Sequence, residues 1–149
     1  MPIYPLQKPR DDNAFTIPHD HEQIEGSELL IRGIPSQQIV NQRISSGAFK
    51  SSSDPYKGMS VDLERCSEGI DYTSGKYVGA VKFKVQHPRS KNHWVGYDPI
   101  LEPEKNLAHS QIWRPPDPSP KRISDGVSKL VHRNAEWYTE IEGVEIWGK

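Results

Sequence analysis

The sequence predicts an α+β fold, with a single small, mainly antiparallel sheet, one amphipathic C-terminal helix and extended proline-rich arms. Short segments in which apolar and polar residues alternate indicate strands with one buried face. A segment with the apolar spacing of a helix follows them, and strands succeeded by a helix favour α+β over alternating βαβ units. Thirteen prolines and eleven glycines in 149 residues indicate many loops around that core.

The length and composition favour one modest domain. The chain has 149 residues, of which 34% are hydrophobic. Domains most often contain about 100–150 residues, and the usual apolar content is about 45–50%. Residues 1–26 contain four prolines and are predicted to form an extended or flexible arm. Residues 27–149 are predicted to form the single α+β domain.

The clearest predicted strand covers residues 76–85. In an extended conformation Val81 and Phe83 point to the face opposite Lys82 and Lys84, which is typical of a sheet with one solvated side. The other extended segments are expected at 27–32 (a strand or a single helical turn), 42–50, 59–63, 94–101, 107–113 and 144–147 (a strand or a docking tail).

A helix is predicted at 120–134, after a proline-rich connector at 114–120. Ser119 is the expected N-cap, and Pro120 suits the first helical position because its missing N–H would have no partner there. The apolar residues of one helical face are Ile123, Val127, Leu130 and Val131.

Charge and cysteine content limit the possible binding partners and the cellular compartment. The formal net charge is -1, so the whole chain has no strong attraction to nucleic acid or anionic membranes. Cys66 is the only cysteine, which excludes an intramolecular disulfide and suits a reducing compartment. Residues 1–10 lack an apolar run of signal-peptide length, and no stretch approaches the roughly 18 apolar residues of a membrane span. We therefore expect a cytoplasmic protein with no membrane contact.

Several common catalytic signatures do not occur. The sequence has no GxxxxGK[ST] loop, GxGxxG, GxSxG, HExxH or CxxC. This argues against P-loop hydrolases, classical dehydrogenases, α/β-hydrolases and zincins, and no cofactor is predicted. His19 and His21 would point the same way in a strand, but no third ligand has suitable spacing. A solvated polar arm is favoured there over a metal site.

A basic segment between Tyr72 and Tyr97 contains no acidic residue. A cationic sheet face interleaved with aromatic side chains can hold phosphates and stack bases. An ordinary solvated face is the favoured alternative, because charge runs usually serve that purpose. The candidate nucleic-acid-binding residues are Lys82, Lys84, Arg89 and Lys91.

A second group of polar residues lies within otherwise apolar segments. Small hydroxyls, one arginine, one aspartate and one histidine are the groups from which a polar pocket is built. The candidate catalytic residues are Arg32, Ser46, Ser60, Asp98 and His109. The alternative for His109 is a core or rim histidine that is hydrogen-bonded to backbone.

The order of these short motifs resembles a group of short, uncharacterised bacterial proteins. The motifs are R-x-I-P, S-S-x-A-F, S-V-D, D-P and A-H, at Arg32–Pro35, Ser45–Phe49, Ser60–Asp62, Asp98–Pro99 and Ala108–His109. The resemblance covers about residues 30–113 and implies a bacterial source but no particular activity.

A second resemblance is to ADP-ribosyltransferases of the arginine class. These enzymes have an arginine on an early strand, an S-T-S motif on a later strand and then a catalytic glutamate. The segments LLIRG and RISSG look like the first two parts, and Glu140-Ile141-Glu142 has the letters of the third. However, Ser45 and Ser46 follow Arg32 closely, and Glu140 and Glu142 come after the predicted helix.

Three functions remain open. We favour a small cytosolic accessory or binding protein that acts through a protein partner, in a bacterial toxin or defence context. The first alternative is a small enzyme acting on a nucleotide or phosphorylated ligand, similar to an ADP-ribosyltransferase. There Arg32 would hold phosphate, Ser46 and Ser60 would hydrogen-bond it, and His109 would act as general acid or base. The second alternative is a nucleic-acid-binding protein that uses the 72–97 face.

Overall fold

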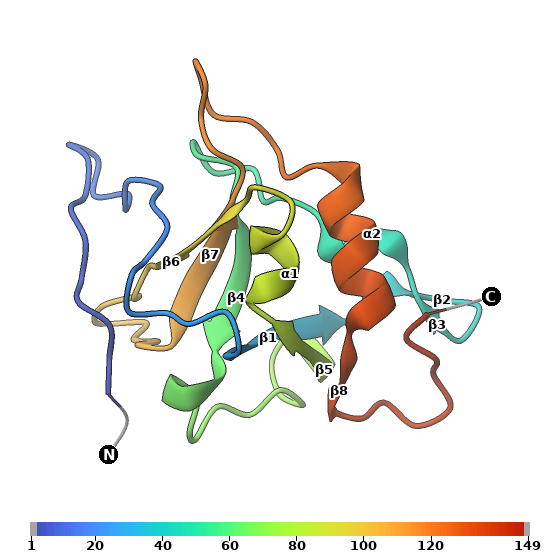
Figure 1. Ribbon diagram of the computed structural model, residues 1–149. Helices are drawn as coiled ribbons and strands as arrows, with labels where there is room; N and C mark the ends of the chain where they lie inside the picture. Colours follow the sequence, from blue (N-terminus) through green and yellow to red (C-terminus); the bar gives the residue numbers. More distant parts are fainter. Residues whose placement is uncertain (1–2, 148–149) are drawn as a thin grey trace.

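A six-stranded antiparallel sheet organises the fold of the computed structural model, which describes residues 3–147 (Figure 1). The strand order is β6-β7-β4-β1-β5-β8, and every neighbouring pair is antiparallel. The prediction of an α+β fold with a mostly antiparallel sheet is therefore confirmed. The strands are β1 (Leu29–Pro35), β4 (Met59–Leu63), β5 (Tyr77–Lys84), β6 (Trp94–Tyr97), β7 (His109–Trp113) and β8 (Glu136–Thr139).

The expected strand at 42–50 is mostly wrong. A separate two-stranded sheet joins β2 (Ile39–Val40) to β3 (Arg43–Ile44), and the chain then enters a short 3-10 helix, η2 (Ser46–Phe49). Burial explains why the chain forms η2 at this point, because this 3-10 helix places Ala48 and Phe49 in the core beneath α2 (Asp125–Asn134), the C-terminal helix. Two further 3-10 helices are η1 (Ser36–Gln38) and η3 (Glu64–Cys66).

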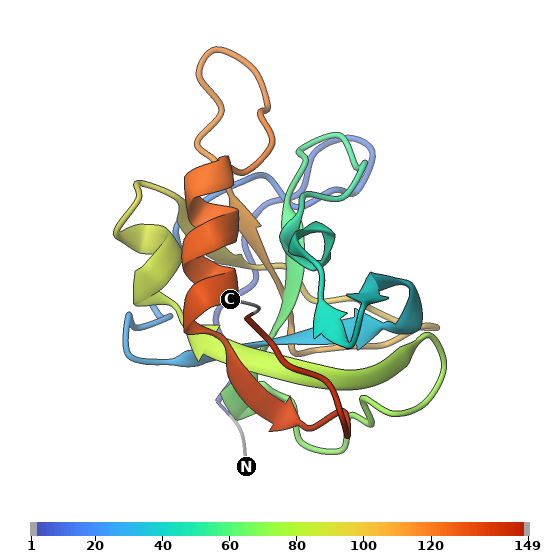
Figure 2. The same cartoon turned by 90° about the vertical axis from the view of Figure 1, so that its right-hand side faces the viewer.

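Two α-helices lie side by side on one face of the sheet, α1 (Gln86–Arg89) and α2 (Asp125–Asn134), as Figures 1 and 2 show. The predicted helix at 120–134 therefore begins later than expected. Its N-cap is Ser124 and not Ser119, because the Ser124 hydroxyl accepts a hydrogen bond from the Val127 amide at 3.2 Å. No helix within residues 3–147 is long and apolar enough to cross a membrane.

The main core lies between the helices and one sheet face. Alternation along β4 places Met59, Val61 and Leu63 in this core and leaves Ser60 and Asp62 on the opposite face. A smaller cluster on that opposite face contains Ile31, Tyr72 and Ala80. The second face is therefore where polar side chains of the central strands can reach solvent.

The N-terminal segment is extended and hydrogen-bonded to the domain. Residues 3–26 contain neither a helix nor a named strand, apart from an isolated bridge between residues 10 and 16. The His21 amide donates to the Val95 carbonyl at 2.9 Å, and Arg89 of α1 donates to the carbonyls of His21 and Ile24. The segment thus runs along β6, the edge strand of the sheet.

Residues 140–147, which follow β8, return to the domain without forming a strand (Figure 2). The Ile44 amide donates to the Glu145 carbonyl at 2.9 Å, and His132 Nε2 lies 2.6 Å from the Ile146 carbonyl. The expectation for 144–147 was a strand or a docking tail, and docking onto β3 and α2 is what the structure has. Residues 1–2 of the predicted arm and 148–149 of the predicted domain lie outside the described residues.

Candidate functional site

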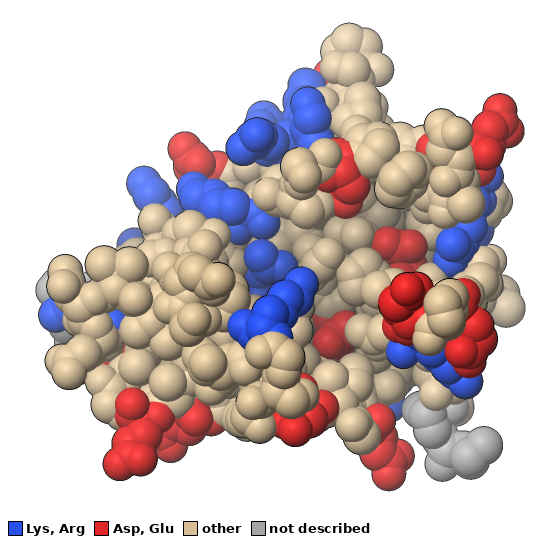
Figure 3. Space-filling model, turned by 180° about the vertical axis from the view of Figure 1, so that it is seen from behind, with Lys and Arg blue, Asp and Glu red and all other residues tan. Residues whose placement is uncertain are grey.

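A polar cavity of about 320 Å³ opens on the sheet face opposite the helices. Seen from behind, the molecule is hollowed near the centre of its surface, and basic and acidic atoms both border the hollow (Figure 3). The lining comes from the strands β1, β4, β5 and β7 and from the loops next to them. The residues are Ile31, Arg32, Gly33, Ser60, Val61, Asp62, Ile70, Asp71, Tyr72, Lys76, Tyr77, Ile100, Asn106 and His109.

Three of the predicted site residues form a hydrogen-bonded chain beside this cavity. His109 Nε2 lies 3.1 Å from the Ser60 hydroxyl oxygen. His109 Nδ1 lies 2.7 Å from the Asp98 carbonyl oxygen and 3.4 Å from the carboxylate oxygen Oδ2. The contact arises because β4 and β7 are adjacent, with Asp62 opposite His109 in the register. The Asp98 carbonyl can accept only from a protonated Nδ1, so Nε2 remains to exchange a proton with Ser60 or a ligand.

Opposing effects act on the ionisation of this pair. Burial lowers the pKa of His109, but hydrogen bonds and charge from Asp98, with a further contribution from Asp62, raise it above its ordinary value. Burial raises the pKa of Asp98, but hydrogen bonds from His109, Thr16 and Gln111 bring it below the usual value. The pair therefore favours a carboxylate next to an imidazole that is more basic than usual.

Arg32 also lines this cavity, although its register partner Val81 and its neighbours on the same face of β1, Leu30 and Ile34, belong to the main core. Its Nε donates to the Ala48 carbonyl at 2.8 Å and its Nη1 to the Ser60 carbonyl at 2.5 Å. Burial lowers the pKa of this guanidinium. None of the ion pairs found among residues 3–147 involves Arg32. A partly buried cation bonded only to neutral carbonyls leaves its charge for an anionic ligand group to compensate.

Asp62 is a cavity residue that the sequence reasoning left outside the candidate site. Its Oδ2 accepts from the Tyr72 hydroxyl at 2.6 Å, and its Oδ1 accepts from Asn106 Nδ2 at 3.0 Å. Burial, together with the Asp62 charge, strongly raises the pKa of the Tyr72 hydroxyl, which keeps it a proton donor. The signal in the sequence was its position two residues after Ser60, which puts both side chains on one face of β4.

One predicted catalytic residue is outside the cavity. Ser46 is an exposed residue of η2, which is folded onto α2 on the other side of the sheet, so it does not line this cavity. Its neighbour Ser45 donates to Gln38 Oε1 at 2.6 Å. Glu140 and Glu142 are exposed in the turn after β8 and do not line the cavity.

The candidate nucleic-acid-binding residues do not share one element. Lys82, half-buried, and Lys84, exposed, are on β5, where Val81 and Phe83 are buried as expected. Arg89 belongs to α1 and is occupied by Asp20, at 2.9 Å, and by two backbone carbonyls. Lys91 is exposed in the turn that follows. Arg89 thus anchors the N-terminal segment, and the remaining basic residues are three lysines.

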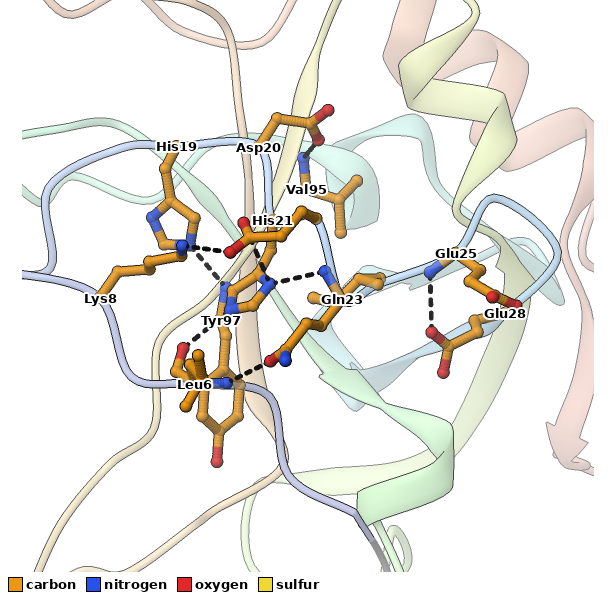
Figure 4. Close-up of polar contacts among 12 residues, drawn as sticks. Leu6, Lys8, His19, Asp20, His21, Gln23, Glu25, Glu28, Val95 and Tyr97 are labelled. Atoms are coloured by element: carbon orange, nitrogen blue, oxygen red, sulfur yellow. Dashed lines mark hydrogen bonds and ion pairs between the residues drawn. The ribbon is translucent and has the colours of Figure 1, made fainter.

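His19 and His21 are engaged by the protein itself (Figure 4). His21 is buried; its Nε2 lies 2.7 Å from the Leu6 carbonyl, and its Nδ1 accepts from the Gln23 amide at 3.0 Å. His19 lies 2.9 Å from the Ile17 carbonyl through Nδ1 and accepts from the Tyr97 amide through Nε2 at 3.2 Å. The His19 ring therefore holds the N-terminal segment to β6, whereas the hydrogen bonds of the His21 ring join Leu6 and Gln23 within that segment. Among residues 3–147 no cluster of three or more metal-ligating side chains occurs.

Comparison with protein-family models, curated proteins and solved structures finds no match to this chain.

Proposed function

We propose that the protein is a small enzyme whose ligand is a nucleotide or another phosphorylated small molecule, bound in the polar cavity. One observation carries the proposal. Arg32, Ser60 and His109 come from three neighbouring strands and line a single cavity, with Asp98 behind the histidine. Structural polar residues would instead be scattered, each bonded to its own local backbone.

The roles follow from the hydrogen bonds. Asp98 holds His109 in the tautomer with a proton on Nδ1, which leaves Nε2 as the exchangeable position facing the cavity. Because the pKa of His109 is raised, more of the ring is protonated at a given pH than in an ordinary histidine, and the imidazolium can donate a proton to a leaving oxygen. The neutral form can accept a proton from a ligand hydroxyl or from Ser60. Arg32 supplies the positive charge for a phosphate.

Transfer of an ADP-ribosyl group is the most specific version of this proposal. Arg32 on β1 and a serine on the adjacent strand β4 support it, since both line the cavity. The serine is Ser60, in the segment SVD, and not the Ser45-Ser46 pair. Neither Glu140 nor Glu142 lines the cavity, so another group would have to take the place of the catalytic glutamate. Because the donor of an ADP-ribosyl group is a dinucleotide, the ligand screen includes dinucleotides beside mononucleotides.

A binding role through a protein partner is the competing proposal, and one observation favours it. Large apolar side chains are exposed along the N-terminal segment, where they are available to a partner. They are Ile3, Tyr4, Leu6, Phe15 and Ile17. This proposal predicts that substitutions in the cavity leave partner binding unchanged.

The test combines thermal melts with a ligand screen of mononucleotides, dinucleotides including NAD, and inorganic phosphate. The wild type should melt at a higher temperature with its ligand, because binding to the native state stabilises it. His109→Ala and Ser60→Ala should fold and lose that shift, whereas the matched control Ser46→Ala should keep it. A large drop in the melting temperature of His109→Ala, with no ligand-induced shift in the wild type, would mean that His109 is structural and would end the enzyme proposal.

A further inference from the structure

The N-terminal segment reaches the candidate site at the turn formed by residues 10–16. Arg10 Nη2 donates to the Pro99 carbonyl at 2.7 Å, and Tyr56 from the loop before β4 donates its hydroxyl to Asp11 Oδ2 at 2.7 Å. The Asp11 amide closes the turn by donating to the Phe15 carbonyl at 2.8 Å. The turn is thus fixed on two sides, and its last residue, Thr16, lies next to Asp98.

Thr16 makes a buried contact with the carboxylate that supports His109. It is 4% exposed, and its hydroxyl donates to Asp98 Oδ1 at 2.7 Å. The other carboxylate oxygen, Oδ2, accepts from Gln111 Nε2 at 3.1 Å and lies 3.4 Å from His109 Nδ1. Both oxygens are therefore held, and rotation of the carboxylate would break contacts on each side.

We propose that Thr16 is a positioning residue of the site, whose hydroxyl keeps the Asp98 carboxylate oriented toward His109. This inference rests on the proposed role of His109 as acid or base. It makes the N-terminal segment a component of the site, although Thr16 itself does not line the cavity. The physical reason is that a carboxylate held by two donors retains one rotamer, and a fixed negative charge orients and stabilises the adjacent imidazolium.

The experiment follows the His109 imidazole by NMR during a pH titration of the full chain, without any ligand. The charged groups that face His109 are Asp98 and Asp62. Thr16→Val keeps the size of the side chain and removes the donor to Oδ1, so only the contacts of Oδ2 still orient the Asp98 carboxylate, which should spend less time facing His109. The His109 pKa should then fall by about 0.5–1 unit, within the range that a nearby opposite charge accounts for. Thr16→Ser keeps the hydroxyl and should titrate like the wild type.

Each outcome decides the inference. An unchanged His109 pKa in folded Thr16→Val, or a Thr16→Ser variant that behaves like Thr16→Val, overturns it. If Thr16→Val does not fold, Thr16→Ala removes the hydroxyl with less volume and is held to the same criterion. Since the titration needs no ligand, a chain that shows the shift but binds none of the screened nucleotides or phosphate would count against the proposed function and leave the orientation of His109 by Thr16 and Asp98 standing.

Discussion

Asp98→Asn should destabilise the protein even though the two side chains have almost the same shape. The Asp98 carboxylate accepts from Thr16 at 2.7 Å and from Gln111 at 3.1 Å, and it lies 3.4 Å from His109 Nδ1. An asparagine has one acceptor oxygen, and its NH₂ group must face one of these donors. At least one hydrogen bond is lost and two donors are brought together.

The magnitude follows from these contacts. A hydrogen bond to a charged group contributes about 1.5–3 kcal/mol, and an unpaired buried donor adds to the loss. We expect the free energy of unfolding at pH 7 to fall by about 2–4 kcal/mol. For a domain of this size, that corresponds to a decrease of about 4–16 °C in melting temperature.

The pH dependence supplies a second test of the same reasoning. The folded-state pKa of Asp98 is below its ordinary value of 3.8, so the carboxylate stabilises the native state above that pH. Its contribution is lost as the pH falls through the folded-state pKa. The difference in the free energy of unfolding between the wild type and Asp98→Asn should therefore have its full size at pH 7 and become smaller below pH 3.8.

The assay is urea denaturation of both proteins at pH 7 and at about pH 3, with Asp12→Asn as an exposed control. The control should stay within about 0.5 kcal/mol of the wild type at pH 7. A loss of less than about 1 kcal/mol for Asp98→Asn, or a difference that does not narrow in acid, would refute the account of Asp98 as a buried charged acceptor.

Three further predictions concern the core. Gly79→Ala would place its Cβ 2.7 Å from the Thr139 carbonyl, so we expect β8 to shift at a cost of about 1–3 kcal/mol; an unfolding free energy equal to that of the wild type would contradict this. Ser128→Ala removes the buried hydrogen bond to the Phe49 carbonyl at 2.5 Å and should cost about 1–3 kcal/mol in urea denaturation, whereas a neutral result would show that the bond is dispensable. Burial raises the pKa of the Cys66 thiol, so iodoacetamide at pH 7 should alkylate it much more slowly in the native than in the unfolded chain, and equal rates would show that the thiol is accessible.

Strands with strict alternation could be predicted from the sequence. The segments MSVDL and KYVGAVKFKV became β4 and β5, because a period of two selects an extended chain with one buried face. The short strand β8 was missed, since Glu136–Thr139 has too few residues for a period to be recognised. The segment RISSGAFK has strand-like composition, but burial of Phe49 against α2 turned it into a 3-10 helix.

Most residues of the candidate site could be selected from the sequence, but which of them lie close together in the fold could not. Arg32, Ser60, Asp98 and His109 stood out as polar groups within apolar segments, and the structure brings them together. Ser46 stood out for the same reason and points elsewhere. The sequence carries no signal that separates these cases, because both serines lie in short strand-like segments.

The sequence by itself determined the local preferences of this protein: which segments alternate, where prolines interrupt them and which polar residues lie among apolar ones. Tertiary structure alone decided that β1, β4 and β7 are neighbours, and hence that Arg32, Ser60 and His109 meet. It also brought Thr16 of the N-terminal segment against Asp98. The physical reason is that periodicity acts over a few residues of chain, whereas strand pairing and docking depend on burying the whole apolar surface at once.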